Sequence, residues 1–232
     1  MHLKQYVPSG VKDTLRRYPT LANVIDRLSI GRRREIPVFT DIPTMLSGDE
    51  SELLFQLAKA NNPEAGKIVE IGCYAGGSTY FLGKGAEISD SRVYSVDPFN
   101  SYLEQQMKEC DGSPYLGNSN IKPSREEVQE TMRKHGLDGR VELIQGFSTD
   151  IASRRRYIGI SMMFIDGNHG KVYDDYTAWR KHFSGNATIA FHDTNYPSYG
   201  RKDTSEVVEE FIKNDGLEVI KRVDSMTVVR FC

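Results

Sequence analysis

The chain has 232 residues, of which 38% are hydrophobic, so it is long enough to bury a full core within one large domain. Its 30 lysines and arginines nearly balance 32 aspartates and glutamates, and the net charge of -2 excludes a strongly basic surface for a nucleic-acid backbone. No apolar run approaches the roughly 18 residues of a membrane span, and the start lacks a secretory leader pattern. We therefore expect a cytoplasmic protein with no nucleic-acid partner and no membrane span.

Residues 1–45 contain several prolines and glycines around one short helical pattern, from Leu21 to Leu28. Such a segment is typical of an irregular extension and not of a core layer. The basic run Arg32-Arg33-Arg34 is interpreted as a solvated turn in preference to a docking site for an anion. The sequence thus predicts an N-terminal helical extension, or lid, over residues 1–45 and one domain over residues 46–232.

From Glu50 onward, helical and strand-like patterns alternate along the chain. The strand-like runs are Lys67 to Ile71, Arg92 to Val96, Val141 to Ile144, Ser161 to Ile165 and Ala187 to Phe191. Helical patterns separate them at Ser78 to Leu82, Ser124 to His135, about Ser148 to Arg155 and Val172 to His182. Strands that are apolar on both faces and alternate with helices are typical of a parallel sheet covered on both sides.

The end of the chain has a different pattern, in which one helix is followed by two strands. The helix is expected from Thr204 to Lys213, and the strand-like runs Leu217 to Val223 and Ser225 to Phe231 are joined by a short turn at Asp224. Strands so close in sequence pair most easily in antiparallel fashion. We therefore predict an α/β fold with a Rossmann-like, doubly wound, seven-stranded sheet that is mostly parallel and has an antiparallel last strand.

Two segments outside this regular pattern carry further expectations. The segment from Ser101 to Lys122 is rich in glycine, serine, asparagine and tyrosine, and a loop of this length is usually functional, so we interpret it as a substrate-side flap. The cysteines, Cys73, Cys110 and Cys232, are scattered and include no C-x-x-C pair. They are therefore expected to be free thiols.

The turn after the first strand, from Gly72 to Thr79, is rich in glycine. In an open α/β sheet the ligand lies beyond the carboxyl ends of the strands, where glycine lets the main chain approach it and Ser78 can cap the next helix. Tyr74 occupies the second glycine position of a dinucleotide-binding G-x-G-x-x-G loop, and no Gly-Lys-Ser or Gly-Lys-Thr of a P-loop follows. Asp97, which ends the second strand, can accept the ribose hydroxyls of a nucleoside. This set favours S-adenosylmethionine over a nicotinamide cofactor.

Two motifs carry a family resemblance over about residues 45–231. The segment from Glu70 to Ser78 resembles the E-L-G-x-Y-x-G-x-S loop of catechol-type O-methyltransferases, which are class I enzymes dependent on S-adenosylmethionine. The segment Gly146-Phe147-Ser148-Thr149-Asp150 is similar to the G-x-S-x-D segment of that family, in which the serine and its neighbour meet the adenine. The resemblance and the loop together assign these residues to the cofactor: Glu70, Gly72, Tyr74, Gly76, Ser78, Asp97, Ser148, Thr149 and Asp166.

Two of these assignments have a structural alternative. Glu70 ends a buried strand and could simply bond to loop amides instead of contacting the cofactor. Ser148 could cap the helix that follows it, in addition to meeting the adenine.

Polar residues follow the fourth and fifth strands, in Asp166-Gly167-Asn168-His169 and His192-Asp193-Thr194. Both groups reach the same edge of a parallel sheet, so Asp166 and Asp193 would place two carboxylates within reach of one ion. Hard oxygen ligands suit Mg²⁺ or Ca²⁺, although two aspartates that cap turns are the alternative. His192 is assigned no catalytic role, because a core histidine explains it equally well.

The same family resemblance bears on these residues. Catechol-type enzymes have an aspartate after the fourth strand, a basic residue three positions later and an Asp-Asn pair after the fifth strand. Here these positions hold Asp166, His169, Asp193 and Thr194. Asp-Gly-x-His is more similar to metal-dependent O-methyltransferases that act on sugars of natural products and glycans. The resemblance thus implies Asp166, Asp193 and Thr194 as ligands of Mg²⁺ and His169 as the base.

From these features we expect an O-methyltransferase that transfers a methyl group from S-adenosylmethionine to a hydroxyl of a sugar or polyhydroxylated small molecule, assisted by Mg²⁺. The expected partner is a small-molecule or glycan acceptor, and a homo-oligomer is left open. Three alternatives remain: a metal-independent methyltransferase acting on nitrogen or a phenol, an oxidoreductase or hydroxylase-like relative on the same fold, and a cofactor-binding module without catalysis.

Overall fold

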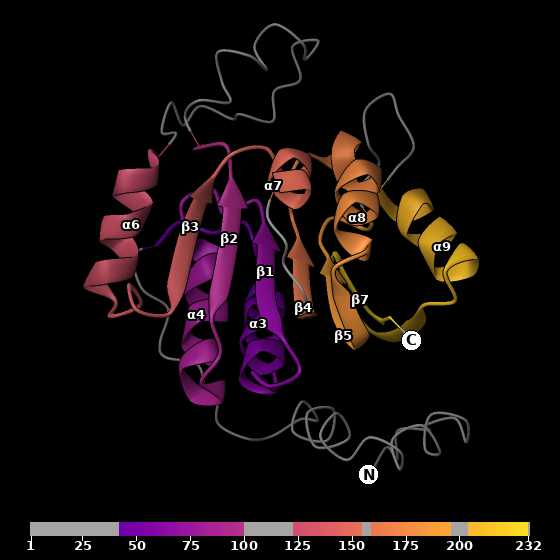
Figure 1. Cartoon of the computed structure of the whole chain (residues 1–232), viewed down its shortest axis with the longest axis horizontal. Coiled ribbons are helices and arrows are strands. Elements are labelled where there is room, and N and C mark those ends of the chain that lie inside the picture. Colours follow the sequence, from indigo (N-terminus) through magenta and orange to yellow (C-terminus); the bar gives the residue numbers. More distant parts are fainter. Residues whose placement is uncertain (1–41, 100–122, 155–158, 196–203, 232) are drawn as a thin grey trace, which may run out of the picture. The chain divides into compact units, whose positions relative to one another are not determined.

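The computed structural model of the chain describes residues 42–99, 123–154, 159–195 and 204–231 (Figure 1). Most of the predicted extension over residues 1–45, with its basic run, lies outside the described residues. The same holds for the predicted flap from Ser101 to Lys122.

Seven strands form one sheet in the described part of the chain. In spatial order they are β3 (Val141–Gln145), β2 (Val93–Asp97), β1 (Lys67–Ile71), β4 (Ile160–Ile165), β5 (Phe183–Phe191), β7 (Met226–Arg230) and β6 (Glu218–Val223). The pairs from β3 to β5 are all parallel, whereas β7 runs antiparallel to both of its neighbours. The predicted mostly parallel sheet with an antiparallel last strand is therefore confirmed.

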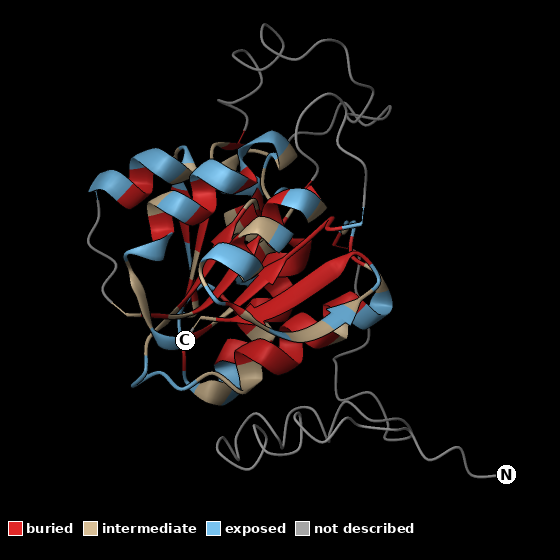
Figure 2. Ribbon diagram, turned by 90° about the vertical axis from the view of Figure 1, so that its right-hand side faces the viewer, coloured by how far each residue is buried: buried red, intermediate tan, exposed pale blue. Residues whose placement is uncertain are grey.

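The helices form a layer on each face of this sheet, and their buried sides face the strands (Figures 1 and 2). They are α3 (Gly48–Lys59), α4 (Gly77–Ser89), α6 (Arg125–Lys134), α7 (Ser148–Arg154), α8 (Val172–Arg180) and α9 (Thr204–Asn214). On the face covered by α7, α8 and α9, Tyr176 stacks on Phe211 with ring centroids 4.0 Å apart, and Trp179 is completely buried. Trp179 thus belongs to the buried face of its helix.

Local sequence explains where two of the helices begin. In α3, the hydroxyl of Ser47 accepts from the N–H of Glu50, and the Glu50 carboxylate accepts from the N–H of Ser47. Ser124 and Glu127 form the same reciprocal capping box at the start of α6. Each box satisfies N–H groups that the helix itself leaves without partners.

Helix α4 is longer than the predicted Ser78 to Leu82, because it continues to Ser89. Gly83 and Gly85 interrupt the apolar pattern that marks a helix in the sequence, although they serve its packing. A Cβ atom at Gly85 would lie 2.4 Å from the main-chain oxygen of Phe55, so this glycine allows α3 and α4 to pack closely. None of the helices in the described ranges combines the length and the apolar composition that crossing a bilayer requires.

Candidate functional site

The glycine-rich segment between β1 and α4, which we call the glycine loop, lies directly against the end of β4. Gly72 has φ +86°, and a Cβ atom there would lie 2.3 Å from the main-chain oxygen of Asp166. Tyr74, in the same loop, also has a positive φ, of 48°, and 42% of its surface is exposed. A bulky residue rarely adopts this conformation, and such strain is often found where a loop meets a ligand. The loop therefore brings its main chain at Gly72 against Asp166 and exposes the aromatic ring of Tyr74.

Asp97 ties the end of β2 to this loop. Its Oδ2 accepts hydrogen bonds from the N–H groups of Cys73 (2.9 Å) and Tyr74 (3.1 Å), and its Oδ1 accepts one from Phe99 (2.6 Å). Burial raises the pKa of Asp97, although these three N–H groups lower it in part. A carboxylate offers about four acceptor positions, so Asp97 can fix the loop and still accept from one further donor.

Glu70 lies beneath the loop and is completely buried. Its carboxylate accepts hydrogen bonds from the hydroxyls of Ser78 (2.5 Å), Thr79 (2.6 Å) and Ser95 (2.6 Å). These contacts join β1, β2 and the first turn of α4. The expectation that Ser78 caps α4 is wrong, because Gly76 with φ 90° is the N-cap and the Ser78 hydroxyl donates to Glu70 instead.

The buried position of Glu70 leads to a prediction about stability and pH. Burial raises the pKa of Glu70 from 4.5 to about 7, against the effect of its three hydroxyl donors. An acid with a raised folded-state pKa stabilises the protein fully below pH 4.5, and this contribution is lost as the pH rises toward 7. Glutamine at position 70 cannot ionise. We therefore expect the free energy of unfolding of Glu70→Gln, minus that of the wild type, to rise by up to about 3 kcal/mol between pH 4.5 and pH 8. Urea unfolding of both proteins at several pH values checks this, and a constant difference would contradict it.

Ser148 and Thr149, the residues predicted to meet the adenine, open α7 directly after β3. The Ser148 hydroxyl accepts from Trp179 Nε1 at 2.8 Å and is also hydrogen-bonded to Asp175. Burial raises the pKa of Asp175 to about 6. Thr149 is exposed beside it. The hydroxyl of Ser148 is thus held by α8, while Thr149 faces solvent.

Four polar side chains converge where β4 and β5 end: Asp166, His169, His192 and Asp193. We call this group the acid–histidine cluster. Asp193 Oδ2 lies 2.7 Å from His169 Nε2 and 3.3 Å from His192 Nδ1. His192 Nδ1 lies 3.0 Å from Asp166 Oδ1. The donor atoms of Asp166, His192 and Asp193 all lie within 4.8 Å of one another, close enough for one metal ion.

Local backbone geometry directs these side chains. Asp193 follows β5 in the left-handed conformation, with φ 55°, which aspartate tolerates better than most residues. The short 3-10 helix η2 (His169–Lys171) carries His169 and is capped by Asn168, whose side chain accepts from the N–H of Gly170. The ends of β4 and β5 thus turn their polar groups toward one another.

The cluster strongly perturbs its own ionisation. Burial alone lowers the pKa of His192, but hydrogen bonds with Asp166, Asp193 and Glu50 raise it to about 12. Burial raises the pKa of Asp193, but hydrogen bonds with His169 and His192 hold it well below its usual range. The hydrogen bond to Asp193 also raises the pKa of His169 above 6.5. Cation and anions therefore stabilise each other at this edge, as is common in functional sites.

Thr194, which was predicted as a metal ligand, has its hydroxyl engaged by other groups of the protein. Its hydroxyl donates to the main-chain oxygen of Ser225 at 2.9 Å and shares a hydrogen bond with the Thr227 hydroxyl at 2.8 Å. These contacts direct the side chain to β7. His192, for which the sequence predicts no catalytic role, lies beside the two carboxylates.

Glu50 is a second residue that sequence reasoning missed. Only 2% of its surface is exposed, and its Oε2 lies 3.4 Å from His192 Nε2. The Ser-x-x-Glu spacing of the capping box was visible in the sequence, but this spacing indicates only a helix cap. No sequence signal pointed to its second contact.

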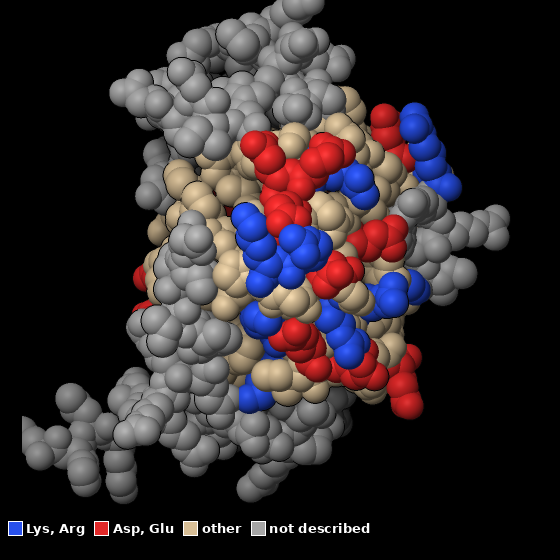
Figure 3. Space-filling model, turned by 90° about the vertical axis from the view of Figure 1, so that its left-hand side faces the viewer, with Lys and Arg blue, Asp and Glu red and all other residues tan. Residues whose placement is uncertain are grey.

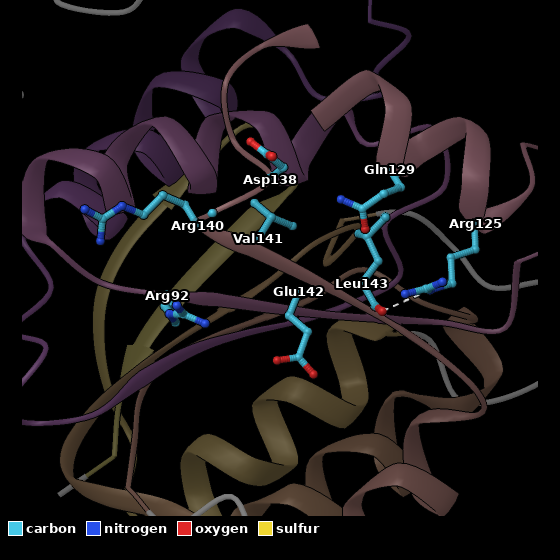
Figure 4. A pocket seen from close by; sticks show the side chains of 9 residues that line it. Arg92, Arg125, Gln129, Asp138, Arg140, Val141, Glu142 and Leu143 are labelled. Atoms are coloured by element: carbon cyan, nitrogen blue, oxygen red, sulfur yellow. Dashed lines mark hydrogen bonds between the residues drawn. The ribbon is translucent and has the colours of Figure 1, made fainter. Parts of the chain in front are cut away.

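A hollow of about 250 Å³ lies elsewhere, beside the starts of β2 and β3 (Figure 4). Two of its arginines are engaged within the protein, because Arg125 Nε donates to the main-chain oxygen of Leu143 and Arg140 pairs with Asp90 at 2.6 Å. Figure 3 shows that acidic and basic side chains are interspersed on this side of the molecule. The hollow is therefore separate from the glycine loop and the acid–histidine cluster, which lie at the carboxyl ends of the strands.

Comparisons with known proteins agree with this architecture. A family model described as a methyltransferase domain matches residues 69–194, from the glycine loop to the end of the acid–histidine cluster. A search of curated proteins found no match.

Three solved structures show the likeness of the fold. The O-methyltransferase from Bacillus cereus in complex with SAH is 16% identical, over 95% of this chain and 97% of that one, with a TM-score of 0.57. The SAH-bound methyltransferase PaMTH1 from Podospora anserina is 15% identical, over 99% and 100% of the two chains, with a TM-score of 0.58. The O-methyltransferase TomG from Streptomyces achromogenes, in complex with SAM, is 16% identical over 99% of each chain, with a TM-score of 0.57. The chain therefore belongs to the methyltransferase domain family and has the fold of class I S-adenosylmethionine-dependent methyltransferases.

Proposed function

We propose that the protein transfers a methyl group from S-adenosylmethionine to a hydroxyl of a sugar or another polyhydroxylated small molecule, assisted by a divalent metal ion. The observation that carries this proposal is the position of the acid–histidine cluster against the glycine loop, where Gly72 meets Asp166. A methyl donor in the loop and an acceptor at the cluster would then be neighbours. The solved O-methyltransferases in complex with SAH or SAM support this reading.

We assign the cofactor to the exposed side of the loop and the nearby strand ends. Gly72, Gly76 and Tyr74 would line it, Asp97 would accept from the ribose, and Asp166 would border it. Ser148 and Thr149 would meet the adenine. Glu70 and Ser78 lie beneath the loop and would act by holding its shape, because Glu70 is completely buried and takes the Ser78 hydroxyl as a donor. The division into an extension over residues 1–45 and a catalytic domain over residues 46–232 is part of this proposal.

The donor set of the cluster fits a divalent ion. Octahedral ligands at about 2.1 Å from an ion lie about 3 to 4 Å apart, so donor atoms within 4.8 Å need only small movements. Such an ion would orient two acceptor oxygens and increase the acidity of the hydroxyl.

Proton removal is assigned to His169. Asp193 orients its ring through Nε2 at 2.7 Å, and 29% of the side chain is accessible, so the imidazole can meet an acceptor from solvent. We assign proton acceptance to the other ring nitrogen, Nδ1. The transfer itself needs the acceptor oxygen in line with the methyl group, and this alignment is the main contribution expected from the protein.

Titration calorimetry and an activity assay test the proposal. We expect S-adenosylmethionine and S-adenosylhomocysteine to bind and NAD not to bind, and a chelator to abolish the methylation of polyhydroxylated acceptors followed by mass spectrometry with labelled cofactor. Preferential binding of NAD would overturn the assignment to methyl transfer. Full activity in the presence of the chelator would exclude assistance by a metal ion.

One observation favours a second candidate, a metal-independent methyltransferase. His192, whose pKa is raised to about 12, can itself be the cation between Asp166 and Asp193. The chelator experiment separates the two candidates, because the second predicts unchanged activity.

A further inference from the structure

Glu50 is a buried acid that its helix cap does not fully explain. Its Oε1 accepts from the N–H (2.9 Å) and the hydroxyl (2.6 Å) of Ser225, in the turn between β6 and β7. Its Oε2 accepts from the N–H of Ser47 at 2.8 Å and lies 3.4 Å from His192 Nε2. Burial alone raises the pKa of Glu50, but hydrogen bonds from His192, Ser225 and Ser47 lower it to about 2. The acid is therefore fixed from two sides and faces the ring of His192.

The ring of His192 is held in one orientation between Glu50 and the two aspartates. Nε2 faces Glu50, whereas Nδ1 lies 3.0 Å from Asp166 Oδ1 and 3.3 Å from Asp193 Oδ2. The ring packs edge-on against Phe164, with centroids 6.3 Å apart, and its main-chain N–H donates to the oxygen of Ile165. The side chain is 5% exposed, so the ring is enclosed by the protein.

This arrangement decides which nitrogen can serve the cluster. If Glu50 accepts the Nε2–H of His192, the lone pair of Nδ1 is available to a metal ion. In most metal-bound histidines, a hydrogen-bond partner of this kind fixes the orientation of the ring. Thr194 offers no comparable donor, because its hydroxyl is bonded to β7.

We infer that Glu50 is a positioning residue that orients His192, and that His192, through Nδ1, is the third protein ligand of the divalent ion in place of Thr194. The inference rests on the metal assistance in the proposed function and names its ligand set. Two carboxylates and one imidazole form a mixed donor set. A donor set that includes an imidazole suits Mn²⁺ or Fe²⁺, whereas the all-oxygen set expected from the sequence suits Mg²⁺.

Pulsed electron paramagnetic resonance of the full chain, with Mn²⁺ alone as the probe, tests the ligand. We expect a ¹⁴N coupling to bound Mn²⁺ in the wild type, in His169→Gln and in Thr194→Val, and its loss in His192→Gln. Circular dichroism confirms that each variant is folded. Bound Mn²⁺ without ¹⁴N coupling, or a coupling that disappears in His169→Gln but not in His192→Gln, would overturn the inference.

The role of Glu50 is tested by comparing two variants at the same helix end. Glu50→Gln preserves the capping box, in which glutamine is equally accepted, but removes the charge that faces His192. We expect it to weaken Mn²⁺ binding by about 10- to 100-fold, the typical effect of losing the partner of a metal-bound histidine. Ser47→Ala removes the cap hydroxyl and its contact with Asp224, so it should lower the melting temperature without changing Mn²⁺ affinity or the ¹⁴N coupling.

The outcomes separate this inference from the proposed function. Equal Mn²⁺ affinity in Glu50→Gln and wild type, or equal weakening in Ser47→Ala, would reject Glu50 as a positioning residue. Absence of Mn²⁺ binding in the wild type would overturn both the inference and the metal assistance, while calorimetry of S-adenosylmethionine would still test methyl transfer. If the cofactor fails to bind but Mn²⁺ behaves as expected, the inference stands and the proposed function is wrong.

Discussion

Replacing Asp193 with asparagine should reduce kcat by about 10²- to 10⁴-fold, because the proposed function makes Asp193 a metal ligand, and such a ligand contributes several kcal/mol to transition-state stabilisation. The substitution keeps the size of the side chain, and asparagine tolerates the left-handed φ of 55° as aspartate does. It removes the charge that lies 2.7 Å from His169 Nε2 and 3.3 Å from His192 Nδ1. Single-turnover assays with labelled S-adenosylmethionine measure the loss.

Asp90→Asn is the matched control for this variant. Asp90 also has a left-handed φ, of 57°, and its carboxylate also pairs with a basic side chain, that of Arg140. It ends α4, far along the chain from the strand ends that carry the cluster. We expect Asp90→Asn to retain the wild-type kcat. If Asp193→Asn also retains it, the cluster does not take part in the reaction.

His169→Ala should slow the single-turnover rate by about 10²- to 10⁴-fold, the usual contribution of a general base. The variant loses the imidazole beside Asp193 but none of the residues assigned to the cofactor, so the affinity for S-adenosylmethionine should not change. Because the substitution leaves room for a small molecule, added imidazole should restore part of the rate. This rescue distinguishes the loss of a base from a change in structure.

His135→Gln provides the comparison for the histidine variant. His135 is the C-cap residue of α6 and packs edge-on against Tyr80, with ring centroids 5.0 Å apart. We expect its substitution to leave the rate unchanged. An unchanged rate in His169→Ala, or a lower rate that imidazole does not restore, would assign proton removal to another group.

The fold could be predicted from the sequence because local pattern and topology determine it. Each of the parallel strands contains a short apolar run that is followed by glycine or a polar residue, and β1 was predicted with the bounds it has in the structure. Helix α4 was predicted too short, because Gly83 and Gly85 resemble helix breakers until their contact with α3 is known. Ser78 was expected to cap this helix for an equally local reason, but a buried carboxylate competes for its hydroxyl.

The sequence by itself determined that Asp166 and Asp193 would meet, because the carboxyl ends of adjacent parallel strands share one edge. Only the tertiary structure decided which residue joins them. His192 lies beside the two carboxylates, whereas the Thr194 hydroxyl bonds to Ser225 and Thr227, and no local pattern encodes that choice. The acid that orients His192 is Glu50, 142 positions away in the chain. That contact arises from the packing of α3 against the end of the sheet, so it becomes visible only in the folded protein.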